Sequence, residues 1–247
     1  MLRFNEFQWA AFLYWAVSYG GNIGGDQDYV PLMSDVVFLE RLRNNPHELT
    51  IQELSKTVIL FLNKWKCMVK DDGATAEAMK SVLVESKAVL QNLGSVTILD
   101  VVMLSDSKVS EISSLYNKFD GIPHIGPTAT SKTMHILKPD LFVMWDSDIL
   151  SHYGKRNPQI DGTGSGYLAF LSTMSEMARE VTDDFEKSYP VSKPEIFLCE
   201  KLGYTLRKSL AKFMDEYNWI TITKGITVPP RWWPNRNDQK VNRYELP

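Results

Sequence analysis

Residues Leu115–Tyr153, LYNKFDGIPHIGPTATSKTMHILKPDLFVMWDSDILSHY, carry the strongest structural signal in the chain. Amphipathic spacing predicts one helix over 107–119, and Asp120-Gly121-Ile122-Pro123 ends it. A second helix is predicted over 127–137, with a proline at its first position, where a missing N–H costs nothing. The pattern predicts two short helices joined by a tight hairpin, spanning 108–137.

A short apolar stretch follows the second helix and leads to a carboxylate. Lys138-Pro139-Asp140 ends the helix, and residues 141–145 are apolar up to Asp146. Asp146 or Ser147 is placed to cap a further helix that reaches Tyr153, because short oxygen-bearing side chains accept from the first free N–H groups of a helix.

The rest of the chain also favours helices. Thr50 and Glu53 form a capping-box pattern, Ser34 is a candidate N-cap, and Gly20–Gly25 is predicted to be a loop. Strand-like alternation is confined to 220–228, so the fold class is all-α (mostly α), as one domain over 1–247. The other predicted helical segments are 5–19, 34–44, 74–92, 95–104, 164–187 and 194–217.

Composition limits the class of protein. A net charge of −3, 44% hydrophobic and 23% charged residues are ordinary for a globular chain. An overall acidic protein can bind nucleic acid only through a local patch.

Compartment and cofactors follow from the cysteines and the N-terminus. Cys67 and Cys199 lack metal-ligand spacing and are expected to be free thiols, which fits a cytoplasmic location. The apolar run Trp9–Val17 is too short to span a bilayer and lacks the flanks of a signal peptide. We expect no metal, no cofactor and no membrane partner.

The chemistry-bearing residues lie in and after the second helix. Lys132 shares a helix face with Thr128, four positions before it. Asp146, at a helix N-terminus, is a carboxylate suited to stabilise an oxocarbenium-like sugar or to activate water or an amine. Lys132 and Asp146 are therefore the candidate catalytic pair, and Asp148 is the alternative carboxylate. His124 and His135 are possible acids or DNA contacts, although a structural histidine is the commoner case.

The run Ile125-Gly126-Pro127-Thr128-Ala129, followed by Val143-Met144-Trp145-Asp146-Ser147, resembles the signature of helix-hairpin-helix DNA glycosylases. Asp146 matches the invariant aspartate of that family. Thr128 stands where the endonuclease III branch has its lysine nucleophile, whereas Lys132, six residues past Gly126, matches the lysine of the archaeal 8-oxoguanine glycosylase branch. His124 replaces the first hairpin glycine.

The resemblance implies a two-lobed helical fold and an enzyme that hydrolyses the N-glycosidic bond of a flipped-out base, leaving an abasic site. The implied partner is double-stranded DNA with a modified base, bound by a monomer. That base is either a glucosylated hydroxymethylcytosine of phage DNA, in antiviral defence, or 8-oxoguanine, in base-excision repair. Accompanying lyase activity stays open. The expected DNA contacts are His124, Gly126, Thr128, Lys155, Arg156, Arg231 and Trp232.

Two alternatives remain at this point. The hairpin also occurs in non-catalytic DNA-binding modules. In an enzyme, Lys132 and Asp146 should converge on one concave pocket, whereas in a module they should point to solvent or to the core. A glycosylase-like scaffold could instead serve a transferase that modifies DNA bases, and product analysis would separate the two reactions.

Overall fold

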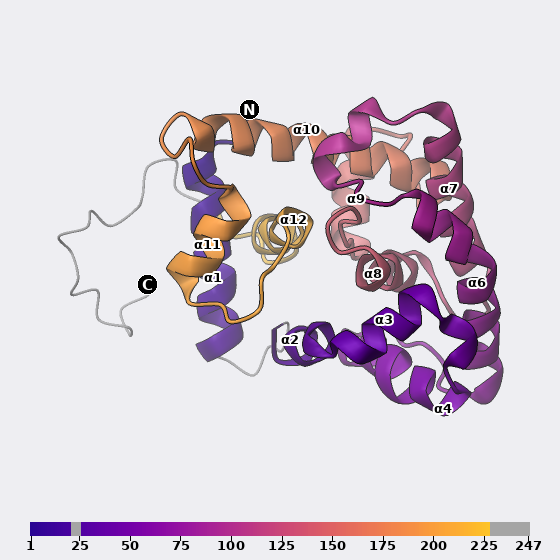
Figure 1. Ribbon diagram of the computed structural model, residues 1–247. Coiled ribbons are helices and arrows are strands. Elements are labelled where there is room, and N and C mark those ends of the chain that lie inside the picture. Colours follow the sequence, from indigo (N-terminus) through magenta and orange to yellow (C-terminus); the bar gives the residue numbers. More distant parts are fainter. Residues whose placement is uncertain (21–25, 228–247) are drawn as a thin grey trace.

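A computed structural model describes residues 1–20 and 26–227 of the chain. These residues form helices joined by turns, and none of them belongs to a β-strand (Figure 1). The prediction of an all-α fold is therefore confirmed for the described part of the chain. The strand-like alternation near residue 220 is helical instead, because residues 219–223 form a π-helical turn.

The helices are short except for two, α6 and α10, which are more than twice as long as most others. The α-helices are α1 (Phe4–Gly20), α2 (Asp26–Ser34), α3 (Val36–Asn44), α4 (Ile51–Leu54), α5 (Leu60–Lys64), α6 (Gly73–Asn92), α7 (Asp106–Asp120), α8 (Pro127–Leu137), α9 (Ser147–Arg156), α10 (Gly164–Glu186), α11 (Pro194–Leu202) and α12 (Leu210–Asn218). The 3-10 and π-helical turns are η1 (Pro46–Glu48), η2 (Ser55–Ile59), η3 (Ile98–Met103) and η4 (Trp219–Thr223).

The helices gather on two sides of the molecule (Figure 1). The N-terminal α1 lies beside the C-terminal α11 and α12, and α3 to α8 lie on the opposite side. The long α10 packs against both sets, since it contacts α7 and η3 as well as α1, α11 and α12. The N-terminal α1 and the C-terminal α11 and α12 thus form one side together. Helices α8 and α12 face the middle of the molecule.

Local sequence signals predicted some helix boundaries correctly and missed others. The capping box of Thr50 and Glu53 is present, as predicted. Asp35, not Ser34, is the N-cap of α3, and its carboxylate accepts from the N–H of Phe38. The segment 95–104 contributes only the 3-10 turn η3.

The helix predicted over 194–217 is wrong. It is two helices, α11 and α12, because the chain turns at Gly203 with φ = 70°, a left-handed conformation that glycine adopts without steric cost. The break lets α12 start a new direction at Ser209, whose hydroxyl accepts from the N–H of Lys212.

The predicted hairpin is present between α7 and α8. The N–H of Ile125 donates to the carbonyl of Ile122 over 3.0 Å, and both side chains are buried. His124, between them, has φ = 67°, in the left-handed region where side chains with a Cβ are strained. The histidine therefore keeps the backbone conformation that a glycine would have at this position.

Both cysteines are free thiols, as expected. Within residues 1–20 and 26–227, no helix combines the length and the apolar character needed to traverse a bilayer.

We predict that the left-handed residue of the hairpin limits stability. His124→Gly should leave the free energy of unfolding unchanged or raise it by up to about 1 kcal/mol, since the steric strain is removed. His124→Val should lower it by about 1–2 kcal/mol, because a β-branched side chain tolerates positive φ least. Urea unfolding of both variants measures the difference, and equal stabilities would contradict the observed turn.

Candidate functional site

Asp146 is the N-cap of α9, as predicted, and both of its carboxylate oxygens have a donor. Oδ1 accepts from the N–H of Ile149 over 2.9 Å, and Oδ2 accepts from the hydroxyl of Thr223 over 2.8 Å. Thr223 ends η4, so a residue far along the chain orients this side chain. The residue is half-buried, which leaves part of it open to a bound molecule.

Lys132 is not a solvated helix lysine, because it is only 7% exposed. It belongs to α8, whose residues from Ala129 to Leu137 are all buried. Its Nζ donates to the carbonyl oxygen of Trp65 over 2.9 Å and lies 5.3 Å from the centre of the Trp65 ring. The ammonium group is thus held by one carbonyl and one aromatic face.

The turn that carries Trp65 has an unusual backbone. Lys66 and Met68 adopt φ values of 60° and 51°, both in the left-handed region. The side-chain amide of Asn63 holds the turn by accepting from the N–H of Val69 and donating to its carbonyl, over 2.7 and 2.9 Å.

Cys67 lies in the same turn and joins the surroundings of Lys132. Its thiol points to the Trp65 carbonyl, 3.7 Å away, which is the same oxygen that accepts from Lys132. Burial raises the pKa of this thiol, and the nearby Lys132 charge opposes the shift only in part. The sulfur is accordingly a neutral thiol beside the amine.

Asp215 of α12 connects the two candidate catalytic residues, and sequence reasoning missed it. Its Oδ2 accepts from Lys212 Nζ over 2.7 Å, and the residue is 7% exposed. Burial raises the pKa of Asp215; the charges of Lys212 and Lys132 oppose this shift, and the Asp146 carboxylate adds to it. The charges of Lys132 and Asp146 thus both act on Asp215, and we call these three residues the carboxylate–lysine group.

A signal for Asp215 is present in the sequence. Lys212, Asp215 and Glu216 have the spacing i, i+3, i+4, which places all three on one face of a helix. That face is also the one that α12 buries. Charged residues on a buried helical face are uncommon and indicate a paired cluster or a functional site.

The other predicted catalytic and phosphate-contacting residues lie apart from this group. Asp148 is exposed in the first turn of α9, with no hydrogen bond from its side chain among the described contacts. Lys155 and Arg156 are exposed at the far end of the same helix, about 15 Å along its axis from Asp146.

The hairpin residues form an open surface at the start of α8. His124 and Gly126 are exposed, and Thr128 is half-buried. Gly126 is the N-cap of α8 without a side-chain cap, and a Cβ added there would meet no atom within 4 Å. Arg231 and Trp232 lie outside the described residues, as does Gly21–Gly25.

His135 is structural. It is fully buried, its Nδ1 donates to the carbonyl of Phe142 over 2.6 Å, and its Nε2 accepts from the hydroxyl of Tyr29 over 2.9 Å. Burial lowers the pKa of His135 to about 3, so the ring is neutral and fixed in one tautomer.

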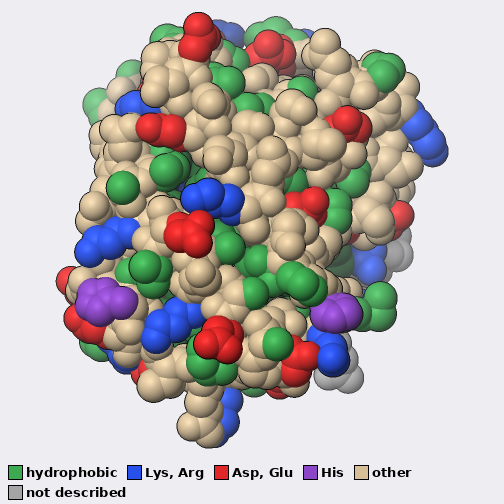
Figure 2. Space-filling model, turned by 90° about the vertical axis from the view of Figure 1, so that its right-hand side faces the viewer, with side chains coloured by type: hydrophobic (Ala, Val, Ile, Leu, Met, Phe, Trp, Pro, Cys, Tyr) green, Lys and Arg blue, Asp and Glu red, His purple; other side chains and the backbone are tan. Residues whose placement is uncertain are grey.

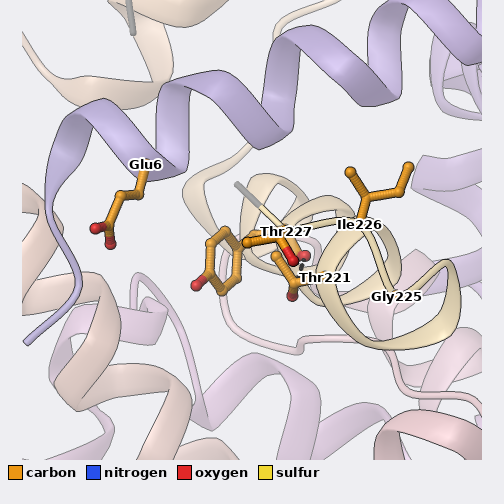
Figure 3. A pocket seen from close by; sticks show the side chains of 6 residues that line it. Glu6, Thr221, Gly225, Ile226 and Thr227 are labelled. Atoms are coloured by element: carbon orange, nitrogen blue, oxygen red, sulfur yellow. Dashed lines mark hydrogen bonds between the residues drawn. The ribbon is translucent and has the colours of Figure 1, made fainter. Parts of the chain in front are cut away.

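A pocket of about 280 Å³ lies on the other side of η4. Figure 3 shows Glu6 of α1 opposite Thr221, Gly225, Ile226 and Thr227 around this space. Burial and, to a lesser degree, the charge of Glu6 raise the pKa of Tyr217, which also lines it. Lys132 and Asp146 do not line this pocket, nor a second one of about 180 Å³ beside η3. The expectation that both residues face one open pocket is not met by either space.

The side of the molecule that carries α6 and α7 has no large basic surface among the described residues. Figure 2 looks onto that side and shows lysine and arginine side chains interspersed with acidic ones. Among residues 1–20 and 26–227, no three histidine, cysteine or acidic side chains are grouped in a way that could hold a metal ion.

Comparison of the chain with models of protein families, with curated proteins and with solved structures found no match.

We predict that Asp146 contributes to stability as a helix cap, in addition to its hydrogen bond from Thr223. Asp146→Ala should lower the free energy of unfolding by about 1 kcal/mol, because the Ile149 N–H loses its acceptor, whereas Asp146→Asn should retain most of it. The same pair of substitutions at Asp35, the N-cap of α3, is the matched control and should behave alike. If chemical denaturation finds no difference between alanine and asparagine at residue 146, the cap is not formed.

Proposed function

We propose that the chain is a DNA glycosylase of the helix-hairpin-helix superfamily, which hydrolyses the N-glycosidic bond of a flipped-out modified base. The observation that carries this proposal is the fixed carboxylate of Asp146 at the start of α9, which follows a hairpin with the left-handed backbone of His124. Lys132 is buried and no described pocket is lined by Lys132 and Asp146, which is the arrangement expected of a non-catalytic DNA-binding module, so that function stays as the alternative.

The arrangement suits the chemistry of base release. Departure of a base leaves an oxocarbenium-like sugar, which a nearby fixed carboxylate stabilises without reorganisation. Two donors fix the orientation of the Asp146 carboxylate, and the residue is half-buried, so part of it is exposed to solvent. Lys132 is buried and its Nζ is held by the Trp65 carbonyl, so contact with the substrate, or attack on C1′ as an amine, would require the side chain to leave that carbonyl.

The hairpin offers a way for an acidic protein to bind DNA. Free N–H groups at the start of α8 can bind a phosphate without a cationic side chain, and the helix dipole favours the negative charge. The absence of a side-chain cap at Gly126 and the open space above its Cα support this role. The left-handed backbone of His124 supports the hairpin geometry despite the missing glycine.

Two substrates remain in view, a glucosylated hydroxymethylcytosine of phage DNA and 8-oxoguanine in a duplex. The two-lobed fold proposed for the chain would bind the extruded base between its helix sets. The gathering of α1, α11 and α12 on one side and of α3–α8 on the other supports this proposal (Figure 1).

Asp146→Asn should abolish base release, with a loss of at least about 10²-fold in the single-turnover rate, because the fixed charge beside the sugar is removed. The assay incubates purified protein with DNA from a phage carrying glucosylated hydroxymethylcytosine and with 8-oxoguanine duplex, and counts abasic sites. Asp35→Asn is the control and should retain the wild-type rate. A folded Asp146→Asn protein of full activity, or no abasic sites from the wild-type protein in either DNA, would refute the proposal.

Gly126→Ala should weaken duplex binding by about threefold to tenfold, because a methyl group would stand where a phosphate approaches the N–H groups. The fold should be unchanged, since the space is open. Gly73→Ala, also at a helix start with open space, is the matched control and should bind DNA like the wild type. Fluorescence anisotropy at fixed salt measures both, and equal affinities would exclude the hairpin as the phosphate contact.

A further inference from the structure

The larger of the two described pockets has no role in the proposed base release, because neither Lys132 nor Asp146 lines it. We call it the Glu6 pocket. It has a volume of about 280 Å³, just below the range of about 300–1,000 Å³ that is usual for ligand pockets, so its size suits a small molecule. Its lining consists of Glu6, Tyr217, Thr221, Gly225, Ile226 and Thr227 (Figure 3).

Glu6 supplies a carboxylate that no described residue neutralises. It is half-buried in the first turn of α1, and its side chain forms no ion pair or hydrogen bond within residues 1–20 and 26–227. None of the lining residues is a lysine, an arginine or a histidine. Lys224, next to Gly225, does not line the pocket, and its Nζ lies 4.6 Å from the centre of the Trp219 ring. The pocket therefore has a negative charge without a matching positive one.

The wall opposite Glu6 is the C-terminal end of a helix (Figure 3). Helix α12 continues without a break into η4, which ends at Thr223. Among the described residues, backbone N–H groups beyond η4 donate to the carbonyls of Trp219 and Ile220, but none donates to those of residues 221–223. The last carbonyls of a helix carry a partial negative charge, which favours a cation.

The remaining groups suit an ammonium group on an aliphatic stem. The Thr221 hydroxyl donates to the Tyr217 carbonyl over 2.8 Å, so its lone pairs are left to accept from a ligand. The Tyr217 hydroxyl has no hydrogen-bond partner among the described residues and can accept as well. The Tyr217 ring and the Ile226 side chain, which is 36% exposed, offer apolar surface to methylene groups.

The same lining disfavours anions and neutral ligands. An anion would be repelled by Glu6 and by the helix carbonyls. A neutral ligand would remove water from the unpaired Glu6 carboxylate without offering a charge in return, which is costly. A protonated amine has three donors and no acceptor, and it therefore matches a pocket of acceptors.

We propose that the Glu6 pocket binds a small aliphatic amine in its protonated form. The ammonium group lies between the Glu6 carboxylate and the C-terminal carbonyls of η4, and the stem lies along Tyr217 and Ile226. The inference does not depend on the proposed function, because no lining residue belongs to the hairpin or to the carboxylate–lysine group.

The test is isothermal titration calorimetry of the full chain with 1,4-diaminobutane at fixed ionic strength. One amine should bind per chain, and the binding should saturate. The neutral analogue 1,4-butanediol has the same stem and should bind at least about tenfold more weakly, because it lacks the charge-assisted hydrogen bonds.

Glu6→Gln should weaken binding of the diamine by at least about tenfold, since the carboxylate is lost while the shape is kept. Glu40→Gln is the matched control, because Glu40 is an exposed residue of α3 that lines neither described pocket and its loss changes the net charge equally. This control should keep the wild-type affinity. Tyr217→Phe should weaken binding by about threefold, and it decides the matter if Glu6→Gln fails to fold.

Amide chemical shifts locate the bound amine in the same protein. Addition of 1,4-diaminobutane should move the signals of Gly225 and Thr227 most. Diol binding as tight as diamine binding, equal losses in Glu6→Gln and Glu40→Gln, shifts that spread over the acidic surface, or no saturable binding would each overturn the proposal.

Discussion

The position of Trp145 determines how the hairpin and Asp146 are related in space. Its indole N–H donates to the carbonyl of Pro127 over 3.0 Å, and its backbone exchanges two hydrogen bonds with the hydroxyl of Ser131. The side chain is fully buried and meets the Tyr167 ring edge-on at 5.0 Å. Replacing a buried tryptophan by alanine costs about 3–5 kcal/mol. The residue before Asp146 is thus tied to the first turns of α8, and the carboxylate is set relative to Lys132.

The second constraint is the burial of charge at α12. Buried ion pairs contribute little net stability, because desolvation offsets most of their attraction, while the loss of one partner is strongly destabilising. The ion pairs of Lys208 and Lys212 therefore define where α12 lies relative to α1 and α2, but they add little to the free energy of unfolding. Buried charges of this kind cannot reorient. A site beside them gains electrostatic stabilisation without having to reorganise its groups.

Sequence reasoning was most accurate where the signals were local. The hairpin, the cap at Asp146 and the capping box of Thr50 follow from residues within a few positions of one another. Asp215 could not be placed beside Asp146, because nothing local relates residues that far apart in the chain. The contact between Lys132 and Trp65 was missed for the same reason, because Trp65 lies at the end of α5, far from Lys132 in the sequence. The break at Gly203 was a local signal that helical periodicity on both sides concealed.

The two carboxylates of the carboxylate–lysine group differ in their surroundings. Asp146 is half-buried, caps a helix and accepts from Thr223, so its oxygens face donors. Asp215 is almost fully buried, and its only charged donor, Lys212, is shared with Glu216. Paired acids in contrasting environments are how proteins separate a charge-stabilising group from a proton donor at one pH. In the proposed glycosylase, Asp146 is therefore the carboxylate that would stabilise the sugar.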